Sequence, residues 1–202
     1  SSWHGTQIAG LIGAATDNGL GIAGAGWNAR VLPVRVLGKC GGESPDIAAG
    51  IRWAAGVAVP GVPANPNKAR VINLSLGGKS GVACDHTYQD AINDAIAAGV
   101  TVVAAAGNSD GHALGSPANC RGVIAVAGLR HTGTKVGYSD AGPEVSLSAP
   151  AGNCVNPSGA CLYPIMSTTN SGTTTPAASG YTNGTTDLGL GTSFSAPLTA
   201  AT

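Results

Sequence analysis

The chain has 202 residues, of which ten are basic and ten acidic, so its formal net charge is zero. Nucleic acids and anionic membrane surfaces both select basic proteins, and this balance therefore argues against either as a partner. Hydrophobic residues make up 43% of a chain that has no apolar run near the roughly 20 residues of a membrane-spanning helix, so we expect one globular domain with a sizeable core.

Helix and strand signals alternate along the chain. Ser44 and Pro45, for example, supply an N-cap and a first-turn proline. Apolar residues recur at helical spacing between Tyr88 and Ile96, and Gly99 follows as a suitable C-cap. In chain order we expect a helix over residues 4–15, a strand over 30–37, a helix over 44–58, a strand over 71–76, a helix over 88–96, strands over 100–106, 123–127 and 145–148, and a last helix that begins at Ser193.

This order of elements predicts the fold class. Strands that alternate with helices of 10–15 residues are typical of βαβ units. Residues 100–106 are almost uniformly apolar, as in a strand of a parallel sheet that is buried on both faces. We therefore expect an α/β fold of three layers, with a mostly parallel central sheet and helices on both of its faces. Residues 150–190 are rich in serine, threonine and glycine, and we expect them to form long surface loops around a site.

The five cysteines show neither a CxxC pair nor the spacing of a zinc site. Disulfides formed in an oxidising compartment are the favoured interpretation. Cys154 and Cys161 are close enough in sequence to staple a loop, and Cys84 and Cys120 could link a helix start to a strand start. Cys40 would then pair with a cysteine outside these residues. The alternative is five buried free thiols.

Three residues indicate a nucleophilic hydrolase. In open α/β sheets, ligands gather at the carboxyl ends of the strands. His4 and Ser193 each begin an expected helix, and Asn108 follows the apolar strand 100–106. A serine hydroxyl attacks only when a base takes its proton, and a histidine is such a base. The oxyanion formed by acyl transfer also needs fixed donors, which the Asn108 amide and the Ser193 backbone N–H could supply.

Four segments resemble, in the family's order, the motifs of the subtilisin-like serine peptidases (subtilases). They are HGTQIAG at residues 4–10, LSLGG at 74–78, AAAGN at 104–108 and GTSFSAP at 191–197. The resemblance runs along the whole chain and is strongest to secreted bacterial members. It implies the subtilisin-like fold and a serine endopeptidase that cleaves peptide bonds through an acyl-enzyme intermediate.

The resemblance also assigns roles. It implies that His4 is the general base and then the general acid, that Ser193 is the nucleophile, and that Asn108 donates to the oxyanion. It further implies that a short segment pairs with the substrate backbone as an added strand, a mode of binding through main-chain hydrogen bonds. That segment consists of Ser75, Leu76 and Gly77.

A second segment should form a wall of the pocket for the substrate residue before the cut. By resemblance it consists of Ala104, Ala105, Ala106 and Gly107. Small side chains leave such a pocket wide, so we expect a preference for large apolar or aromatic substrate residues. The nearby Asp110 could instead favour a basic residue.

The acid of the expected catalytic triad is missing from this chain. Subtilases carry the triad in the order Asp, His, Ser, and only three residues precede His4. We therefore expect residues 1–202 to be part of a catalytic domain that lacks the Asp-bearing N-terminal part and the last helices, and to be nearly inactive alone. Asp17, Asp140 and Asp187 are the candidate substitutes, and we expect none of them to reach the imidazole by the direct hydrogen bond that a triad requires.

The chemistry should need no cofactor, but a structural calcium ion is an expectation of the resemblance. Calcium takes oxygen ligands from side chains and backbone carbonyls, which Asp17 and its loop could supply. The alternative is a solvated aspartate in a turn. The expected partners are a protein or peptide substrate and the protein's own propeptide, and we expect a secreted monomer.

Three other interpretations compete with this one. Residues 19–24 match GxGxxG, the dinucleotide-binding pattern, but a helix rather than a strand precedes them, which favours a simple glycine loop. A non-catalytic peptide-binding relative would keep the cleft without the chemistry. A serine hydrolase acting on esters would use the same nucleophile and base.

Overall fold

The computed structural model describes residues 3–154, 159, 161–182 and 188–202. A parallel four-stranded sheet lies at its centre, in the order β1-β2-β3-β4. The sheet strands are β1 (Val71–Leu74), β2 (Thr101–Ala105), β3 (Val123–Leu129) and β4 (Val145–Pro150), and the helices are α1 (His4–Gly13), α2 (Ser44–Ala54), α3 (His86–Ala97) and α4 (Thr192–Ala200).

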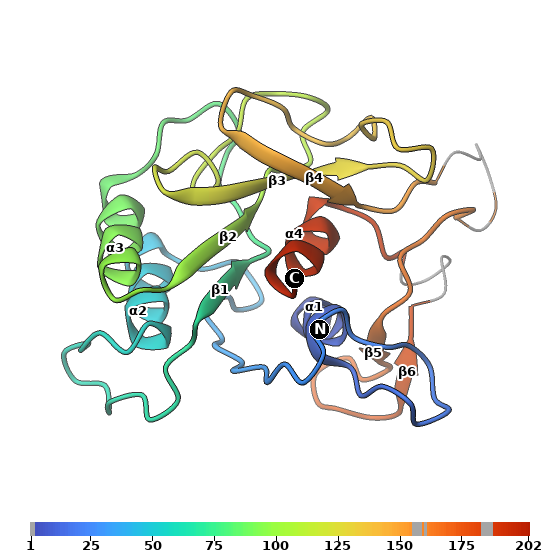
Figure 1. The fold of residues 1–202 in the computed structure, drawn as a ribbon, viewed down its shortest axis with the longest axis horizontal. Helices are drawn as coiled ribbons and strands as arrows, with labels where there is room; N and C mark the ends of the chain where they lie inside the picture. The colour runs from blue at the N-terminus through green and yellow to red at the C-terminus, as the bar shows by residue number, and fades with distance from the viewer. Residues whose placement is uncertain (1–2, 155–158, 160, 183–187) are drawn as a thin grey trace.

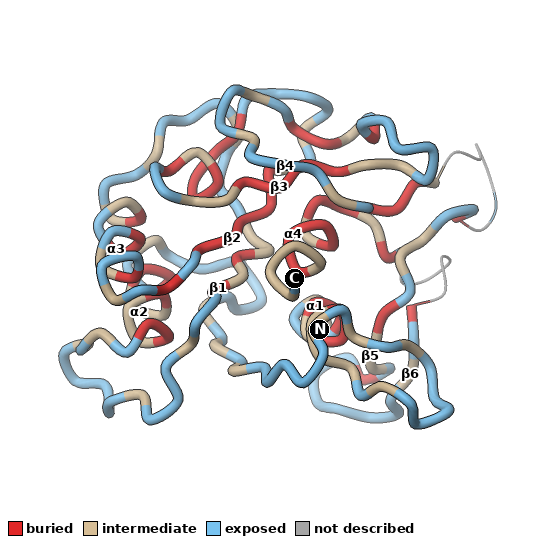
Figure 2. Tube along the Cα trace, viewed as in Figure 1, coloured by how far each residue is buried: buried red, intermediate tan, exposed pale blue. Residues whose placement is uncertain are grey.

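Helices cover both faces of the sheet, as Figure 1 shows: α2 and α3 lie on one face and α4 on the other, with α1 packed against α4. The alternation of β2 explains the two-sided core. Val102 and Ala104 pack towards α2 and α3, whereas Val103 and Ala105 pack towards α4. In Figure 2, burial is concentrated in β2, in most of β3 and on the inner sides of the helices, whereas β4 at the edge of the sheet is exposed or half-buried. The predicted three-layer α/β fold is confirmed.

The helix signals read from the sequence are largely confirmed. In α3 the Asp85 side chain caps the helix by accepting a hydrogen bond from the Thr87 backbone N–H over 2.7 Å, and the helix is followed by Gly99 at a φ of 79°. Pro45 lies in the first turn of α2, but the N-cap is Glu43, one residue before the expected Ser44. Boundaries elsewhere shift by a few residues: α1 and α2 end earlier than expected, and β4 ends later.

The strand predicted over residues 30–37 is wrong. Leu32, Val34 and Val36 are half-buried and alternate with exposed neighbours, as the residues of a half-buried strand would. Val34 and Val36 pack on the core, yet the segment joins no ladder among the described residues, and Pro33 has no N–H to donate. The alternating exposure therefore reflects docking of this segment onto the core and not pairing in the sheet.

Residues 150–190 are not loops throughout. They contain an antiparallel pair, β5 (Thr168–Asn170) and β6 (Ser179–Tyr181), which packs beside α1. The hydroxyl of Ser167 donates to the Gln7 carbonyl, and that of Thr168 donates to the Thr6 carbonyl over 2.8 Å. The pair thus fixes the helix that carries His4. The rest of this segment that the structure describes is irregular, as expected.

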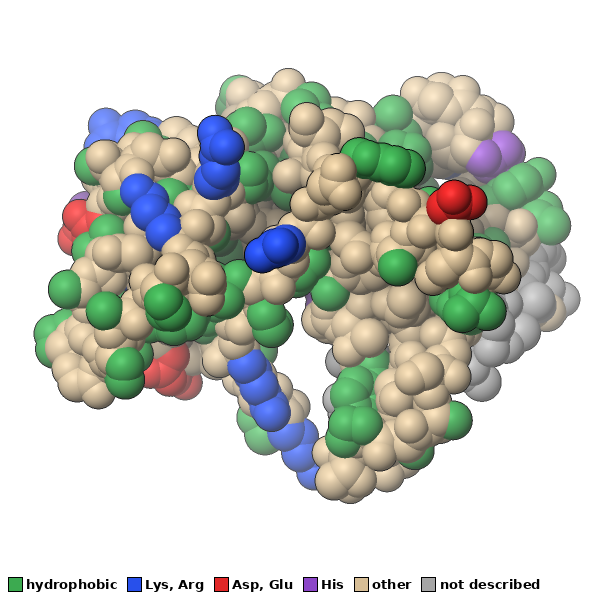
Figure 3. All heavy atoms as spheres, turned by 60° about the horizontal axis from the view of Figure 1, so that its bottom comes forward, with side chains coloured by type: hydrophobic (Ala, Val, Ile, Leu, Met, Phe, Trp, Pro, Cys, Tyr) green, Lys and Arg blue, Asp and Glu red, His purple; other side chains and the backbone are tan. Residues whose placement is uncertain are grey.

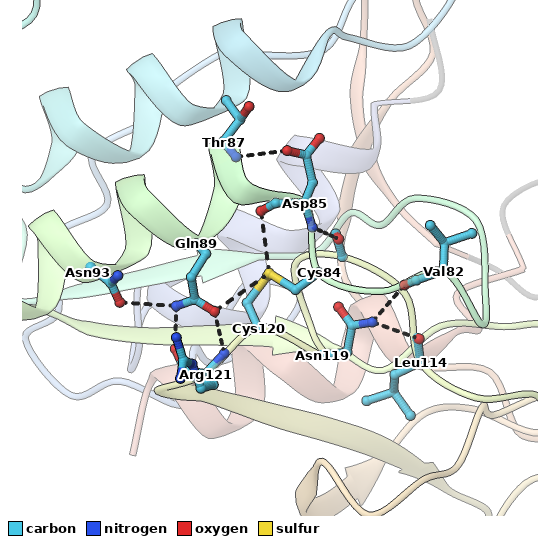
Figure 4. Close-up of a disulfide and its surroundings, with 11 residues drawn as sticks. Val82, Cys84, Asp85, Thr87, Gln89, Asn93, Leu114, Asn119, Cys120 and Arg121 are labelled. Atoms are coloured by element: carbon cyan, nitrogen blue, oxygen red, sulfur yellow. Dashed lines mark hydrogen bonds between the residues drawn. A yellow bond between two sulfur atoms is a disulfide. The ribbon is translucent and has the colours of Figure 1, made fainter.

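Both predicted disulfides are confirmed: Cys84 bonds to Cys120 and Cys154 to Cys161. Cys40 is an exposed free cysteine. Figure 4 shows that the first disulfide joins the segment before α3 to the segment before β3. Gln89 reinforces this junction, since its side-chain oxygen accepts from the Arg121 backbone N–H over 2.8 Å.

The surface agrees with the neutral composition. On the face seen in Figure 3, acidic and basic side chains are scattered over several elements and do not gather in one patch. None of the helices in the described residues is long and apolar enough to cross a membrane.

Candidate active site

The predicted nucleophile Ser193 is the second residue of α4, directly behind a sharp turn. Gly191 adopts a φ of 134°, which only glycine takes readily, and its N–H donates to the Ala151 carbonyl over 2.9 Å and to the Tyr138 hydroxyl over 3.0 Å. The start of α4 is therefore held against the carboxyl end of β4. This places Ser193 at the edge of the sheet where ligands bind in open α/β folds.

Thr192 joins this turn to the predicted oxyanion donor. It is fully buried, and its backbone N–H donates to the Asn108 side-chain oxygen over 2.8 Å while its hydroxyl approaches the same oxygen at 3.1 Å. Asn108 itself is exposed. Because Oδ1 is engaged by Thr192, the Nδ2 group is left to donate to a bound molecule. This is the arrangement that an oxyanion hole requires.

Ser193 is bonded to Ser75, which immediately follows β1. The Ser75 hydroxyl donates to the Ser193 carbonyl over 2.7 Å, and the Ser193 hydroxyl donates to the Ser75 carbonyl over 3.4 Å. The second bond is long, so the nucleophilic hydroxyl is only weakly tethered. The ends of β1 and β2 and the start of α4 thus meet at one point.

His4 lies beside this point, at the start of α1. Its ring is edge-on to Phe194, the residue after the nucleophile, with 6.3 Å between ring centroids. Burial lowers the pKa of the His4 imidazole below its ordinary value of 6.5, which favours the neutral form that can act as a base. The Ser193 hydroxyl points to Ser75, and the described hydrogen bonds do not include one between His4 and Ser193.

A groove of about 560 Å³ runs from His4 along the segment that the resemblance assigns to the substrate backbone. Its lining includes Ser75, Leu76 and Gly77, together with Ile47 of α2 and Tyr88 of α3. Its full lining is His4, Leu37, Gly41, Gly42, Ser44, Ile47, Ser75, Leu76, Gly77, Gly78, Lys79, Val82, Ala83, Asp85, Tyr88 and Ser116.

The alanines of the predicted pocket wall are buried in the protein. Ala104 and Ala106 belong to the core under α2 and α3, and Ala105 belongs to the core under α4. Only Gly107, which is half-buried, and the backbone could border a substrate pocket. Asp110 is exposed in a turn at a φ of 59°. The expected substrate preference therefore stays a prediction.

The structure describes two of the three candidate acids. Asp17 lies in an exposed turn at a φ of 54°, and Asp140 is fully buried and bonded to Ser80 and Ser109. Neither has a described hydrogen bond to His4, and Asp187 lies outside the described residues. In the part of the chain that the structure covers, no group of three His, Cys, Asp or Glu side chains could hold a metal ion.

Sequence reasoning missed the structural roles of three residues that shape this site: Thr192, Tyr138 and Asp140. The Tyr138 hydroxyl lies 2.6 Å from the Ala151 carbonyl and accepts from Gly191, so it fixes the turn before the nucleophile. Burial raises the pKa of Tyr138 to about 12. No local pattern marks these residues, because their partners are distant in sequence.

Comparisons with known proteins agree with this geometry. Residues 1–202 match the family described as the Subtilase family. The chain is 51% identical to an extracellular protease of Xanthomonas campestris, over 92% of this chain and 30% of that protein. It is 40% identical to an extracellular basic protease of Dichelobacter nodosus, over 98% of this chain and 30% of that protein.

Solved structures give the same answer. A protease from Pseudoalteromonas arctica superposes with a TM-score of 0.89 and 48% identity, covering 100% of this chain and 57% of that one. A cold-adapted subtilisin-like serine proteinase superposes with a TM-score of 0.69 and 28% identity, covering 98% of this chain and 58% of that one. The chain thus spans less than a third of the two relatives above and little more than half of each solved protein.

Proposed function

Because the chain belongs to the subtilase family, we propose that it carries the nucleophile, base and oxyanion donor of a secreted serine endopeptidase. The observation that carries this proposal is the junction at Ser193. Thr192, the residue before the nucleophile, is hydrogen-bonded to the Asn108 side chain. Ser193 itself is hydrogen-bonded to Ser75, which lines the same groove as His4.

The proposed reaction begins with a rotation of the Ser193 hydroxyl from the Ser75 carbonyl to the His4 imidazole. Side chains change between staggered rotamers, and catalytic hydrogen bonds are often long before substrate binds. His4 then takes the hydroxyl proton while Ser193 Oγ bonds to the substrate carbonyl carbon. The oxygen of that carbonyl becomes an oxyanion, which the Asn108 amide and the Ser193 backbone N–H stabilise.

The second half of the reaction returns the proton. The His4 imidazolium donates to the leaving amine as the C–N bond breaks, which leaves an ester on Ser193. A water molecule gives a proton to His4 and attacks the ester, and the acid product departs as Ser193 is reprotonated. Atoms and protons balance, and no cofactor is consumed.

We propose that an aspartate outside residues 1–202 orients His4. The support is that no described acidic side chain is bonded to the imidazole, although the imidazolium formed in the reaction needs such a partner. In subtilisin, a member of this family, loss of that aspartate lowers kcat on the order of 10⁴-fold. The 202 residues alone should therefore be nearly inactive.

The substrate would bind in the groove as an added strand beside Ser75, Leu76 and Gly77. The names of the two relatives and the two disulfides support export from the cell, since disulfides persist in oxidising compartments. A calcium ion at the Asp17 loop, a propeptide and a monomeric state remain predictions. Loss of thermal stability on chelation, absent from an Asp17→Ala variant, would support the calcium ion.

Hydrolysis of internally quenched peptides by the natural gene product tests the proposed function. We expect cleavage that Ser193→Ala abolishes. Matched peptide and ester substrates separate the alternatives, since an esterase would turn over only the ester. Tight binding of the peptide without cleavage would favour the non-catalytic relative and defeat the proposal.

A further inference from the structure

We infer that Asp140 is a positioning residue for the oxyanion donor Asn108, an inference that rests on the proposed function. Asp140 lies between β3 and β4 and is 0% exposed. An acidic side chain is almost never fully buried unless it is paired or hydrogen-bonded. Its contacts therefore show what the protein uses it for.

Asp140 holds both neighbours of Asn108. The Asp140 backbone N–H donates to the Gly107 carbonyl over 3.0 Å, and the Asp140 Oδ1 atom accepts from the Ser109 backbone N–H over 2.8 Å. Asn108 thus lies between two residues, Gly107 and Ser109, that are both hydrogen-bonded to Asp140. A shift of its backbone would break one of these bonds.

The other carboxylate oxygen extends the contact to a second loop. Oδ2 accepts from the Ser80 hydroxyl over 2.8 Å, and the Ser80 hydroxyl lies 2.7 Å from the hydroxyl of Ser109. Each hydroxyl has one proton, so the ring closes when Ser109 donates to Ser80 and Ser80 donates to Asp140. This ring ties the loop after β2 to the loop that follows the substrate-binding segment.

The glycine before Asn108 makes room for the carboxylate. Gly107 has a φ of 118°, and a Cβ atom there would lie 2.3 Å from the Asp140 Oδ2 atom. The carboxylate therefore packs where any other residue would place its side chain. Close approach of this kind explains why glycine precedes the oxyanion donor.

Asn108 is consequently fixed from two sides. Asp140 holds its backbone through Gly107 and Ser109, and Thr192 holds its side-chain oxygen. Both are needed to aim the Nδ2 group, because an oxyanion donor acts only when its geometry is set in advance. Asp140 itself contacts no reacting atom, so its effect must pass through Asn108.

The test is a double-mutant cycle between Asp140→Ala and Asn108→Ala in the natural gene product. We expect Asp140→Ala to lower kcat about 10- to 100-fold with KM changed less than about threefold, because only the transition state uses the oxyanion donor. In the Asn108→Ala background the same substitution should cost less than about threefold. Asp140→Asn should recover most of kcat, since its carbonyl can still accept from Ser109 and its amide can donate to Ser80.

Activity is divided by the fraction of enzyme that a fluorophosphonate labels, so unfolded protein does not count. If Asp140→Ala yields no folded enzyme, Asp140→Ser is measured in its place. A kcat loss that is equally large in both backgrounds would overturn the inference, as would failure of Asp140→Asn to restore kcat.

A second measurement does not depend on activity. In ¹⁵N NMR spectra, Asp140→Ala or Asp140→Ser should speed hydrogen exchange at the Ser109 amide and shift the Asn108 side-chain amide, and Asp140→Asn should do neither. An unchanged Asn108 signal would contradict the positioning role. An inactive parent enzyme with these NMR changes would defeat the proposed function and leave the positioning role supported.

Discussion

The hydroxyl of Ser75 donates to the carbonyl oxygen of Ser193 over 2.7 Å. In a regular helix that carbonyl would accept from the N–H of residue 197, but Pro197 has no N–H. The proline in α4 therefore leaves open the acceptor that Ser75 fills. This bond docks the nucleophile onto the end of β1, where the substrate groove begins.

The Ser75–Ser193 bond predicts a specific coupling in stability. Ser75→Ala leaves the Ser193 carbonyl without its donor and should lower the free energy of unfolding by about 1–3 kcal/mol. In a Pro197→Ala background, the new N–H can take over this carbonyl, so the cost should fall by about 1 kcal/mol. Urea unfolding measures both values.

Ser195→Ala is the matched control for this cycle. Ser195 lies on the same helix, but its hydroxyl donates to the carbonyls of Ala149 and Pro150. Ser195→Ala should lower the free energy of unfolding by the same amount with and without Pro197. If Ser75→Ala lowers the free energy of unfolding equally in the two backgrounds, Pro197 is not the reason why the Ser193 carbonyl needs Ser75 as its donor.

Asn108→Ala should lower kcat far more than it changes KM. Subtilisin loses about 10²–10³-fold in kcat when its oxyanion asparagine is removed, and we expect the same range here. Asn108→Asp is the control, since it keeps an acceptor for the Thr192 N–H but loses the donor. We expect it to fold as well as the parent and to be equally impaired in kcat. Normal turnover by either variant would exclude Asn108 from the oxyanion hole.

His4 should titrate below its ordinary range in the 202-residue chain, because burial lowers the pKa of its imidazole from 6.5. The unfolded chain then binds a proton more readily than the folded one. Stability is therefore fully present above pH 6.5 and falls as the pH drops through the folded pKa. An NMR titration assigned with His4→Gln measures the midpoint, and a value above 6.5 would reveal a carboxylate partner instead.

Tyr138 should ionise well above the ordinary tyrosine range, since burial raises its pKa to about 12. Its contribution to stability is present below pH 10, the ordinary tyrosine value, and is lost as the pH rises towards the folded pKa. Phenolate absorbance should therefore show a late component near pH 12. We expect this component to vanish in Tyr138→Phe, and its persistence there would assign it to another tyrosine.

The two disulfides should differ in their contribution to stability. Cys84 and Cys120 are 36 residues apart in sequence, and Cys154 and Cys161 are 7 apart. Loop entropy predicts losses of about 4 kcal/mol and about 2 kcal/mol when each pair is replaced by alanine. Urea unfolding of the two double variants measures the difference. A larger loss from the shorter loop would mean that local packing, and not chain entropy, dominates.

Local patterns were sufficient for much of the fold. The spacing of Tyr88, Ala91, Ile92 and Ala95 follows one face of α3, and all four are buried. The uniformly apolar strand before Asn108 is indeed buried on both faces. These elements depend on neighbours in sequence, and so their signals are present in the sequence itself.

The features that were predicted wrongly or not at all depend on contacts between residues that are distant in sequence. Residues 30–37 are rich in valine and leucine, as strands often are, but strand formation depends on a ladder partner that no local pattern reveals. The β5–β6 pair escaped notice because its serines and threonines are typical of loops. The roles of Thr192 and Asp140 depend on contacts across 84 and 31 positions, respectively. His4, Asn108 and Ser193 were singled out by their expected places at helix starts and after a strand, and their individual roles came from the resemblance of the surrounding motifs to a known family.

The most direct test of the proposed catalytic site is mass spectrometry of the natural gene product after treatment with a fluorophosphonate. A serine that a histidine activates should form one covalent adduct, and we expect it on Ser193, with the reaction slowed strongly in His4→Ala. An adduct on another serine, or unchanged labelling of Ser193 without His4, would contradict the proposed nucleophile and base.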